Sequence, residues 1–382
     1  MHDPAQAWNV LTVGAYTELD KITDPSLKDY SPIAGRGQLS PFTTTSHTWH
    51  RDWPLKPEIV MEGGNLAHDG KGAVDQCDDL SVLSTSHSPP IRHFAPHSMT
   101  SAATAQASWL AAQIQCAYPD VWPETVRALM VHSATWSDQL KEQFLEGESK
   151  TAYGKLLRVC GYGVPDLSRA LYSASDAVTL IAQKEIQPYD RRKSGNGFRT
   201  RDMHVHHLPW PKEVLLSLPD DVDVQMRVTL SYFPEPGPGA IGWKDRYRYA
   251  SFGLRFDVKA PDESKDEFVR RINKAVRTEE KGAPGTSSAA DHWVIGANAR
   301  NKGSIHSDIW KGTAAELASS DAITVYPVIG WWKERSYLGR WNRRSRYSLI
   351  ASIATTAEDV DIYTPIAAKL KVPVSALAFA IT

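Results

Sequence analysis

The sequence has few cysteines, no excess of charge of either sign and no long apolar run. It holds 3 Cys in 382 residues, Cys77, Cys116 and Cys160, and none lies in a CxxC pair that could bind zinc. A disulfide scaffold is therefore excluded, and a reducing, cytoplasmic setting is favoured. With 43 Lys+Arg against 44 Asp+Glu, the net charge of −1 gives no field that would draw the chain to nucleic acid or to an acidic membrane surface.

Two further absences concern membranes and cofactors. No stretch approaches the roughly 20 apolar residues that span a bilayer, and the N-terminus shows no basic and then apolar signal peptide. No spacing of residues predicts a bound cofactor or metal. We therefore expect no membrane partner, no nucleic-acid partner and no cofactor.

The pattern of apolar residues changes along the chain. Before about residue 180, apolar runs at 10–17 and 57–62 alternate with polar loops and two predicted helices, as in an α/β domain. After Ala177, alternating runs bounded by turn residues predict strands, and the boundary falls near 175 to 200. The sequence thus predicts an α/β domain over 1–180 and a β-sandwich of jelly-roll type over 200–382. The predicted helices are 101–118, 123–132 and 263–276; the strands of the second domain are 224–233, 249–258, 322–329 and 347–355; the loops are 30–53, 67–97 and 187–200.

Ser101 stands at the start of the first predicted helix, which is rich in alanine. The N-terminus of a helix carries unpaired N–H groups and partial positive charge, so a hydroxyl there can attack a carbonyl while nearby N–H groups hold the developing oxyanion. The alternative is that Ser101 only caps the helix, because serine is a preferred N-cap residue.

Five segments of the first domain share one family pattern. They are 7–15 (AWNVLTVGA), 56–63 (KPEIVMEG), 100–105 (TSAATA), 122–129 (WPETVRAL) and 161–166 (GYGVPD). Their order and spacing resemble the C-terminal half of the catalytic domain of the subtilisin-like serine proteases (subtilase, peptidase S8 family). The resemblance covers roughly residues 4–175 and implies a partial subtilisin-like parallel-sheet domain in which Ser101 is the nucleophile.

The chain departs from the family pattern in two ways. Met99 stands where the family has the glycine of Gly-Thr-Ser, and Ala105 stands where proline is usual; because methionine resists backbone angles that glycine permits, the turn before Ser101 is expected to be strained. The 100 residues before Ser101 contain neither the sequence context of the family's catalytic histidine nor that of its aspartate or oxyanion asparagine. A serine without a base is a poor nucleophile at neutral pH.

The second domain resembles the β-sandwich tail of bacterial cytosolic subtilases that are encoded beside AAA-type ATPases. The segments that carry this resemblance are 303–310 (GSIHSDIW) and 325–333 (VYPVIGWWK). It implies an AAA ATPase as one partner, and the missing catalytic groups imply another, an N-terminal subtilase fragment encoded upstream.

Three other clusters could carry chemistry. His87, His93 and His97, with Asp78 and Asp79, could supply a substitute base for Ser101, although we expect solvated side chains. The second cluster is His204, His206 and His207, which could bind zinc if a third ligand were present. The third cluster is basic and aromatic, and it could either bind phosphate or an acidic partner or form a hairpin with a solvated tip. Its members are Lys333, Arg335, Arg340, Arg343, Arg344 and Arg346 with neighbouring Trp331, Trp332, Tyr337, Trp341 and Tyr347.

The sequence therefore predicts a subtilisin-type serine endopeptidase that acts on polypeptides and has little or no activity as this chain alone. The alternative is a non-catalytic, truncated subtilase that acts as a β-sandwich interaction module. Complementation by a separate chain would leave this chain with an exposed hydrophobic sheet edge until the partner binds.

Overall fold

The computed structural model of the chain describes residues 4–50, 52–171, 177–193, 197–219, 222, 224–237, 249–280, 290–355 and 379–380. The chain divides into two compact units. The first consists of Met1–Asp120 and Leu129–Ala170, and the second of Val121–Ala128 and Leu171–Thr382. Among the described residues, no helix has both the length and the apolar character to cross a bilayer.

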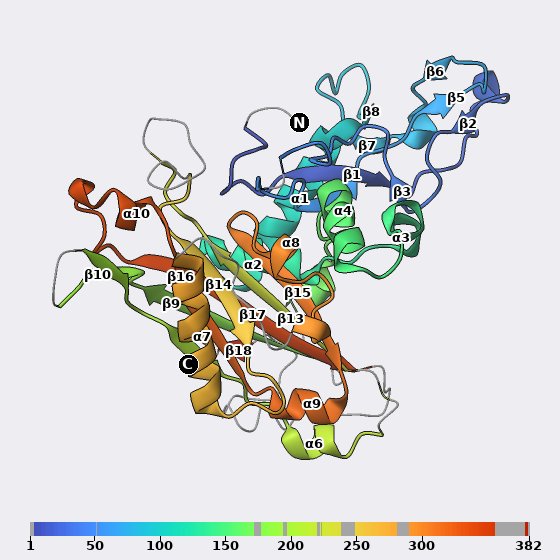
Figure 1. Ribbon diagram of the computed structural model, residues 1–382. Helices are drawn as coiled ribbons and strands as arrows, with labels where there is room; N and C mark the ends of the chain where they lie inside the picture. The colour runs from blue at the N-terminus through green and yellow to red at the C-terminus, as the bar shows by residue number, and fades with distance from the viewer. Residues whose placement is uncertain are drawn as a thin grey trace. The chain divides into compact units, whose positions relative to one another are not determined.

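A three-stranded sheet in the order β3-β1-β4 forms the centre of the first unit (Figure 1). β1 and β4 are parallel, and β1 and β3 are antiparallel. Both long strands begin later than the sequence predicts. Pro57 has no N–H to give to a strand ladder, and the N–H of Thr12 donates instead to the Glu58 carboxylate at 2.7 Å.

The other elements of the first unit surround this sheet. α1 lies along β1 and β4, and α3 and α4 cover Val60 of β4 with apolar side chains. The segments 30–53 and 67–97, predicted as loops, contain short strands. The elements are β1 (Val13–Thr17), η1 (Pro25–Leu27), β2 (Ser31–Pro32), β3 (Gln38–Leu39), β4 (Ile59–Glu62), β5 (Ala67–His68), β6 (Val74–Asp75), η2 (Asp78–Leu80), β7 (Val82–Thr85), β8 (Phe94–His97), α1 (Met99–Ala117), α3 (Asp138–Phe144), α4 (Lys150–Cys160) and α5 (Leu167–Leu171).

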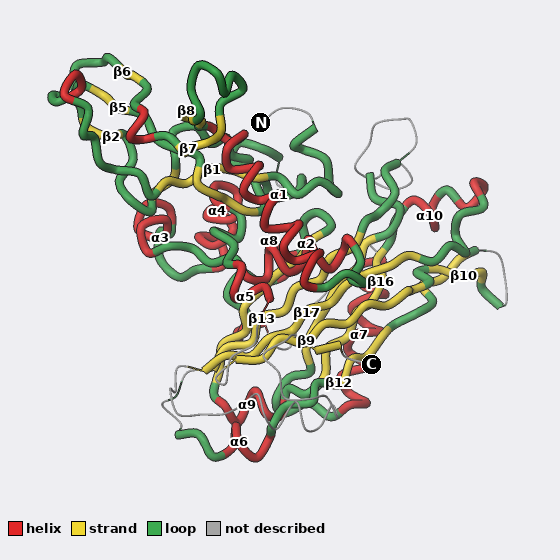
Figure 2. The backbone as a smooth tube through the Cα atoms, turned by 180° about the vertical axis from the view of Figure 1, so that it is seen from behind, coloured by secondary structure: helices red, strands yellow, loops and turns green. Residues whose placement is uncertain are grey.

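Two large sheets and the small two-stranded sheet β10-β11 lie in the second unit (Figure 2). One has the order β15-β13-β17-β9-β18, in which only the short β18 is parallel to its neighbour. The other has the order β12-β16-β14 and is antiparallel. One hydrophobic cluster contains buried side chains from both sheets, among them Leu180, Leu230 and Phe256, so the two sheets share a core.

The predicted strands of the second unit are all present, with shifted ends. The sequence analysis missed its long first strand and several short helices. The elements are β9 (Ala177–Ile186), β10 (Tyr189–Arg191), β11 (Phe198–Thr200), β12 (His204–His207), α6 (Lys212–Leu216), β13 (Val224–Tyr232), β14 (Gly253–Val258), α7 (Lys265–Glu280), η4 (Ala290–His292), α8 (Ala297–Arg300), β15 (Ile305–Gly312), α9 (Ala314–Ser319), β16 (Ala322–Val328), α10 (Trp331–Glu334), η5 (Ser336–Leu338), β17 (Ser345–Thr355) and β18 (Phe379–Ala380).

The helix α2 (Pro123–Ser133) begins within the second unit, which includes its residues up to Ala128. The guanidinium of Arg127 is buried and donates to the Ser231 hydroxyl at 3.0 Å, to the carbonyl of Tyr232 at 2.8 Å and to the carbonyl of Ser304 at 2.7 Å. Its cation also lies over the ring of Phe233, 4.3 Å from the centroid. A charge so fully hydrogen bonded fixes this first part of α2 onto β13.

An ion pair is buried at the start of β4. Lys56 and Glu58 are almost inaccessible to solvent, and their side chains contact each other directly. The Lys56 ammonium also donates to the carbonyl of Val10 at 2.7 Å, while Glu58 accepts from Thr12. The pair therefore joins the segment before β1 to the segment before β4.

We expect Lys56→Met to destabilise the first unit by about 3 kcal/mol, because it leaves the Glu58 carboxylate buried without its cation. The double variant Lys56→Met, Glu58→Gln should recover a large part of that loss, since the amide keeps an acceptor for Thr12 and carries no charge. Urea unfolding of each variant measures the effect. Lys141→Met, which breaks the exposed pair with Asp138, is the control and should change little; equal losses in both single variants would contradict the role of the buried pair.

Candidate active site

Two consecutive glycines at the end of β4 bring the backbone against the turn that leads into α1. A Cβ at Gly63 would lie 2.4 Å from the Cβ of Ala15 and 3.2 Å from the carbonyl oxygen of Met99. Gly64 has φ +80, and a Cβ there would lie 3.0 Å from the Cβ of Ser98. Only glycine allows this close approach. The start of α1 is thereby held at the carboxyl end of β4.

Met99 takes up the strained conformation that the sequence predicts. Its φ is +74, and it is the one non-glycine residue with positive φ among the described residues. Its N–H donates to the carbonyl of Gly63 at 2.7 Å. The left-handed conformation costs a non-glycine residue about 1–2 kcal/mol. This hydrogen bond and the packing of the glycines hold the turn in that conformation.

Ser101 lies in the first turn of α1 and is not its cap. The N-cap is Ser98, so Ser101 is the third helical residue, and the interpretation of Ser101 as an N-cap is wrong. The side chain is exposed. The hydroxyls of Thr104 and Ser108 donate to carbonyls one turn earlier, at 2.7 and 2.8 Å. Ser101 makes no such bond with any described residue, and its hydroxyl points away from the core at a helix end where N–H groups are unpaired.

The outer face of α1 carries no charge. Residues 99–117 contain no acidic or basic side chain, although only one side of the helix is buried, with Ala103, Ala107 and Ile114 against the sheet. Gln106 fixes the helix by donating from its amide to the carbonyl of Glu62 at 2.7 Å. The exposed positions of α1 are Met99, Ser101, Thr104, Ala105, Ser108, Trp109, Ala112, Gln115, Cys116 and Ala117.

Asn65 is a structural residue of the site that sequence reasoning missed. It is buried, accepts from the N–H of Ala34 at 3.1 Å and donates to the carbonyls of Ala34 and Leu19 at 2.7 and 3.0 Å. It thus joins the loops that contain Leu19 and Ala34 to its own loop after β4. The pair of glycines just before it was the available signal, because consecutive glycines after a strand indicate a close backbone approach.

The edge of β1 that faces away from β4 is largely covered. The N–H of Ala15 donates to the Thr43 hydroxyl at 3.0 Å, and its carbonyl accepts from the N–H of Ser40 at 3.1 Å. β3 pairs with Tyr16 and Thr17 beyond that point. The exposed hydrophobic edge expected from complementation is therefore limited to the start of the strand.

The histidines proposed as substitute bases lie on or near the β7–β8 hairpin. His87, His93 and His97 are exposed, and none forms a hydrogen bond with Ser101. Asp79 accepts from the backbone N–H and the hydroxyl of Thr23 at 2.6 and 2.8 Å, and so binds a different loop. Among the described residues, Ser101 is therefore hydrogen bonded to neither an imidazole nor a carboxylate.

A comparison with protein families identifies the first part of the chain. Residues 1–163 match the model of the subtilase family. This part is a subtilase-like domain. An uncharacterized protein of Sinorhizobium fredii (strain NBRC 101917 / NGR234), y4bN, is 30% identical to the chain over 263 residues, which is 66% of this chain and 54% of that protein. The chain spans about half the length of this curated relative.

The match of the subtilase-like domain includes the β4 segment, the glycine turn and Ser101. The segment 161–166, which the resemblance also used, overlaps its end. There Gly161 and Gly163 have positive φ, and a Cβ at either would lie within 2.5 Å of backbone atoms of Glu58 or Thr135. The motif glycines are thus required by close backbone contacts.

Outside the subtilase-like domain, His204 and His206 converge on one tyrosine. The ring nitrogens Nδ1 of His204 and Nε2 of His206 lie 2.7 and 2.8 Å from the hydroxyl of Tyr347, which joins β12 of one sheet to β17 of the other. His207 points elsewhere and is exposed. Within the described part of the chain, no group of three His, Cys, Asp or Glu side chains could hold a metal.

Replacement of Met99 by glycine is expected to stabilise the subtilase-like domain by about 0.5–1 kcal/mol, since relief of the left-handed strain exceeds the entropy that glycine adds to the unfolded chain. Met99→Val should destabilise it, because a β-branched side chain resists positive φ more strongly. Denaturant midpoints measure both. Thr100→Gly, one residue later, is the control and should destabilise; a loss of stability in Met99→Gly would show that the side chain matters more than the strain.

The stability of the second unit should fall as the pH is lowered from 7.5 to 5. Burial lowers the pKa of His206 to about 4, with smaller effects of the charges of His204, Lys184 and His207. The unfolded chain, with an ordinary histidine pKa of about 6.5, binds the proton in this range while the folded chain does not, so stability is fully present above pH 6.5 and is lost progressively toward pH 4.

The expected contribution of His206 is about 2 kcal/mol between pH 7.5 and 5. Burial also lowers the pKa of His204 and His306, so their effects have the same sign. Urea unfolding followed by tryptophan fluorescence at several pH values measures the slope. His206→Gln should reduce the slope of stability against pH, whereas Tyr347→Phe, which keeps the His206 imidazole, should retain the slope. An unchanged slope in His206→Gln would contradict the assignment.

Proposed function

We propose that the chain supplies the nucleophile of a serine endopeptidase of the subtilisin family, with Ser101 attacking the carbonyl of a polypeptide substrate. The observation that carries this proposal is the hydroxyl of Ser101, exposed and without a hydrogen-bond partner among described residues, in the first turn of a helix held by the glycines of β4. The match to the subtilase family over this segment supports the same role. The unpaired N–H groups of the first turn would help to hold the oxyanion.

The base, its orienting acid and the oxyanion asparagine come, in this proposal, from polypeptide outside these 382 residues. The charge-free outer face of α1 supports a partner segment there, because a helix face that stays in water normally carries charged side chains. An N-terminal subtilase fragment, encoded upstream as part of the same protein or of a separate one, would cover this face and complete the triad. The chain alone would then turn over peptides slowly or not at all.

The second unit acts in this proposal as a β-sandwich that packs on the peptidase domain or recruits a partner such as an AAA ATPase. Its support is the single hydrophobic cluster shared by two mainly antiparallel sheets, which is how a sandwich buries its inner faces. The border predicted between residues 180 and 200 would cut β9, so in this proposal the border lies before Ala177. The three free cysteines support a reducing, cytoplasmic setting.

A fluorophosphonate probe tests the nucleophile. The chain alone should label weakly. Coexpression with the polypeptide encoded directly upstream should raise labelling by about 100-fold or more, because a general base then takes the proton of Ser101. Gel fluorescence and mass spectrometry of the labelled peptide measure the extent and the position.

Ser101→Ala should abolish labelling, and Ser108→Ala, which removes an exposed hydroxyl two turns further along α1, should retain it. Labelling that survives Ser101→Ala contradicts the assigned nucleophile. Absence of labelling in every combination would favour the alternative, a non-catalytic truncated subtilase that acts as an interaction module.

A further inference from the structure

The second unit contains a concentration of positive charge that the proposed peptidase chemistry does not use. The segments 191–201 and 340–346 together hold 9 of the 43 Lys and Arg residues of the chain in 18 residues, and neither segment contains an acidic residue. The chain as a whole has a net charge of −1. The basic residues are thus collected in two short segments that lie about 140 residues apart in the sequence.

The fold brings these two segments together. Phe198 of the β10–β11 hairpin packs against Trp341, with ring centroids 5.1 Å apart. Figures 1 and 2 both show β10 beside the segment that follows α10. We call the exposed cations of these two segments, together with the exposed Tyr337 and Leu338 just before the second segment, the basic surface.

The base of the second segment is held rigidly. Glu235 pairs with Arg340 and accepts from the indole N–H of Trp332 at 3.0 Å, while its carbonyl accepts from the indole N–H of Trp331 at 3.2 Å. The aromatic side chains at 331–337, just before this segment, were expected either at a binding face or at the base of a hairpin, and they are found in both kinds of position. Trp331 and Trp332 are buried at the base, and Tyr337 remains 76% exposed.

Several cations of the basic surface have no counter-charge. Arg191, Arg192, Lys193 and Arg343 are exposed, and none forms an ion pair with any residue that the structure describes. The neighbouring cations Arg199 and Arg344 have carboxylates only at 3.9 Å, and such long exposed pairs contribute little. Arg346 differs, because it lies 3.6 Å from the buried Glu124 carboxylate and over the ring of Trp122. The surface thus has positive charge available for a partner.

We propose that the basic surface binds an acidic polypeptide segment that also carries apolar side chains. The unpaired cations would attract the acidic groups, and the exposed Tyr337 and Leu338, which precede Trp341 by a few residues in the sequence, would contact the apolar ones. Arg, Tyr and Trp are the residue types that contribute most to binding at protein interfaces. The net charge of −1 disfavours nucleic acid, whose binding depends on neutralising many phosphates and is typical of strongly basic domains.

The test uses the full chain and three fluorescent probes of equal length. One is a 16-residue peptide of Asp, Glu, Leu and Phe; the second replaces its acidic residues by Asn and Gln; the third is a 16-nucleotide single-stranded oligothymidine. Fluorescence anisotropy in low salt is expected to show that the acidic peptide binds at least about tenfold more tightly than either other probe.

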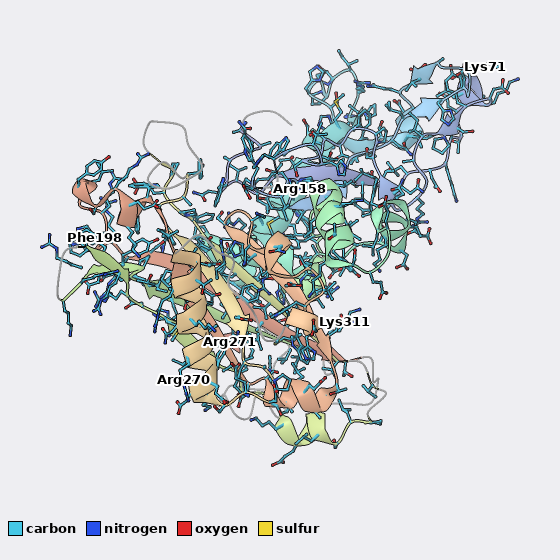
Figure 3. All side chains as sticks on the ribbon, viewed as in Figure 1. Lys71, Arg158, Phe198, Arg270, Arg271 and Lys311 are labelled. Atoms are coloured by element: carbon cyan, nitrogen blue, oxygen red, sulfur yellow. The ribbon has the colours of Figure 1, made fainter. Side chains whose placement is uncertain are left out.

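The triple variant Arg191→Gln, Arg192→Gln, Arg343→Gln should weaken binding of the acidic peptide by about tenfold or more, and Tyr337→Ser should weaken it by about threefold or more. The matched control, Arg270→Gln, Lys274→Gln, Lys311→Gln, removes the same charge from exposed positions of the second unit; Figure 3 shows Arg270 and Lys311 far from Phe198. Equal weakening in the two triple variants, no binding of the acidic peptide, or tighter binding of the oligothymidine would each overturn the proposal.

Discussion

The geometry at Ser101 depends on one close contact between two backbones. Gly63 and Gly64 allow the end of β4 to lie against Ser98 and Met99, and the hydrogen bond between Gly63 and Met99 sets the point at which α1 begins. The exposure of the Ser101 hydroxyl and the position of the first helical N–H groups both follow from that point. A side chain at either glycine would move the helix. The glycine turn is therefore as necessary to this geometry as the motif around the serine.

Much of the first unit could be predicted because its signals are local. The apolar run before Gly63 indicates a strand, and the alanines after Ser101 indicate a helix, so both elements were found to within a few residues. The left-handed conformation at Met99 was expected from a family comparison, since methionine alone predicts no such angle. The glycine pair before Asn65 indicates only a close backbone approach, and the partners of Asn65 could not be predicted, because Leu19 and Ala34 are distant in sequence and offer only backbone groups.

The second unit shows the same division between local and distant information. Alternation of apolar residues located its strands. The link between β12 in one sheet and β17 in the other depends instead on contacts of His204 and His206 with Tyr347, which is about 140 residues away in the sequence. Residues two apart in a strand share a face, so the spacing of His204 and His206 places both rings on one side of β12. It could not show that their common neighbour is a phenol, which makes them part of a buried polar link between sheets.

The position of Arg127 has a consequence for how such a chain can be divided or recombined. The family match ends at residue 163, yet the residues around Arg127 belong to the second compact unit and are hydrogen bonded to β13 and to the start of β15. A chain divided at residue 163, where the family match ends, would separate the guanidinium from these acceptors. The segment matched by the family model and the compact unit therefore differ, and the second unit is intact only with a helical turn that lies inside the match.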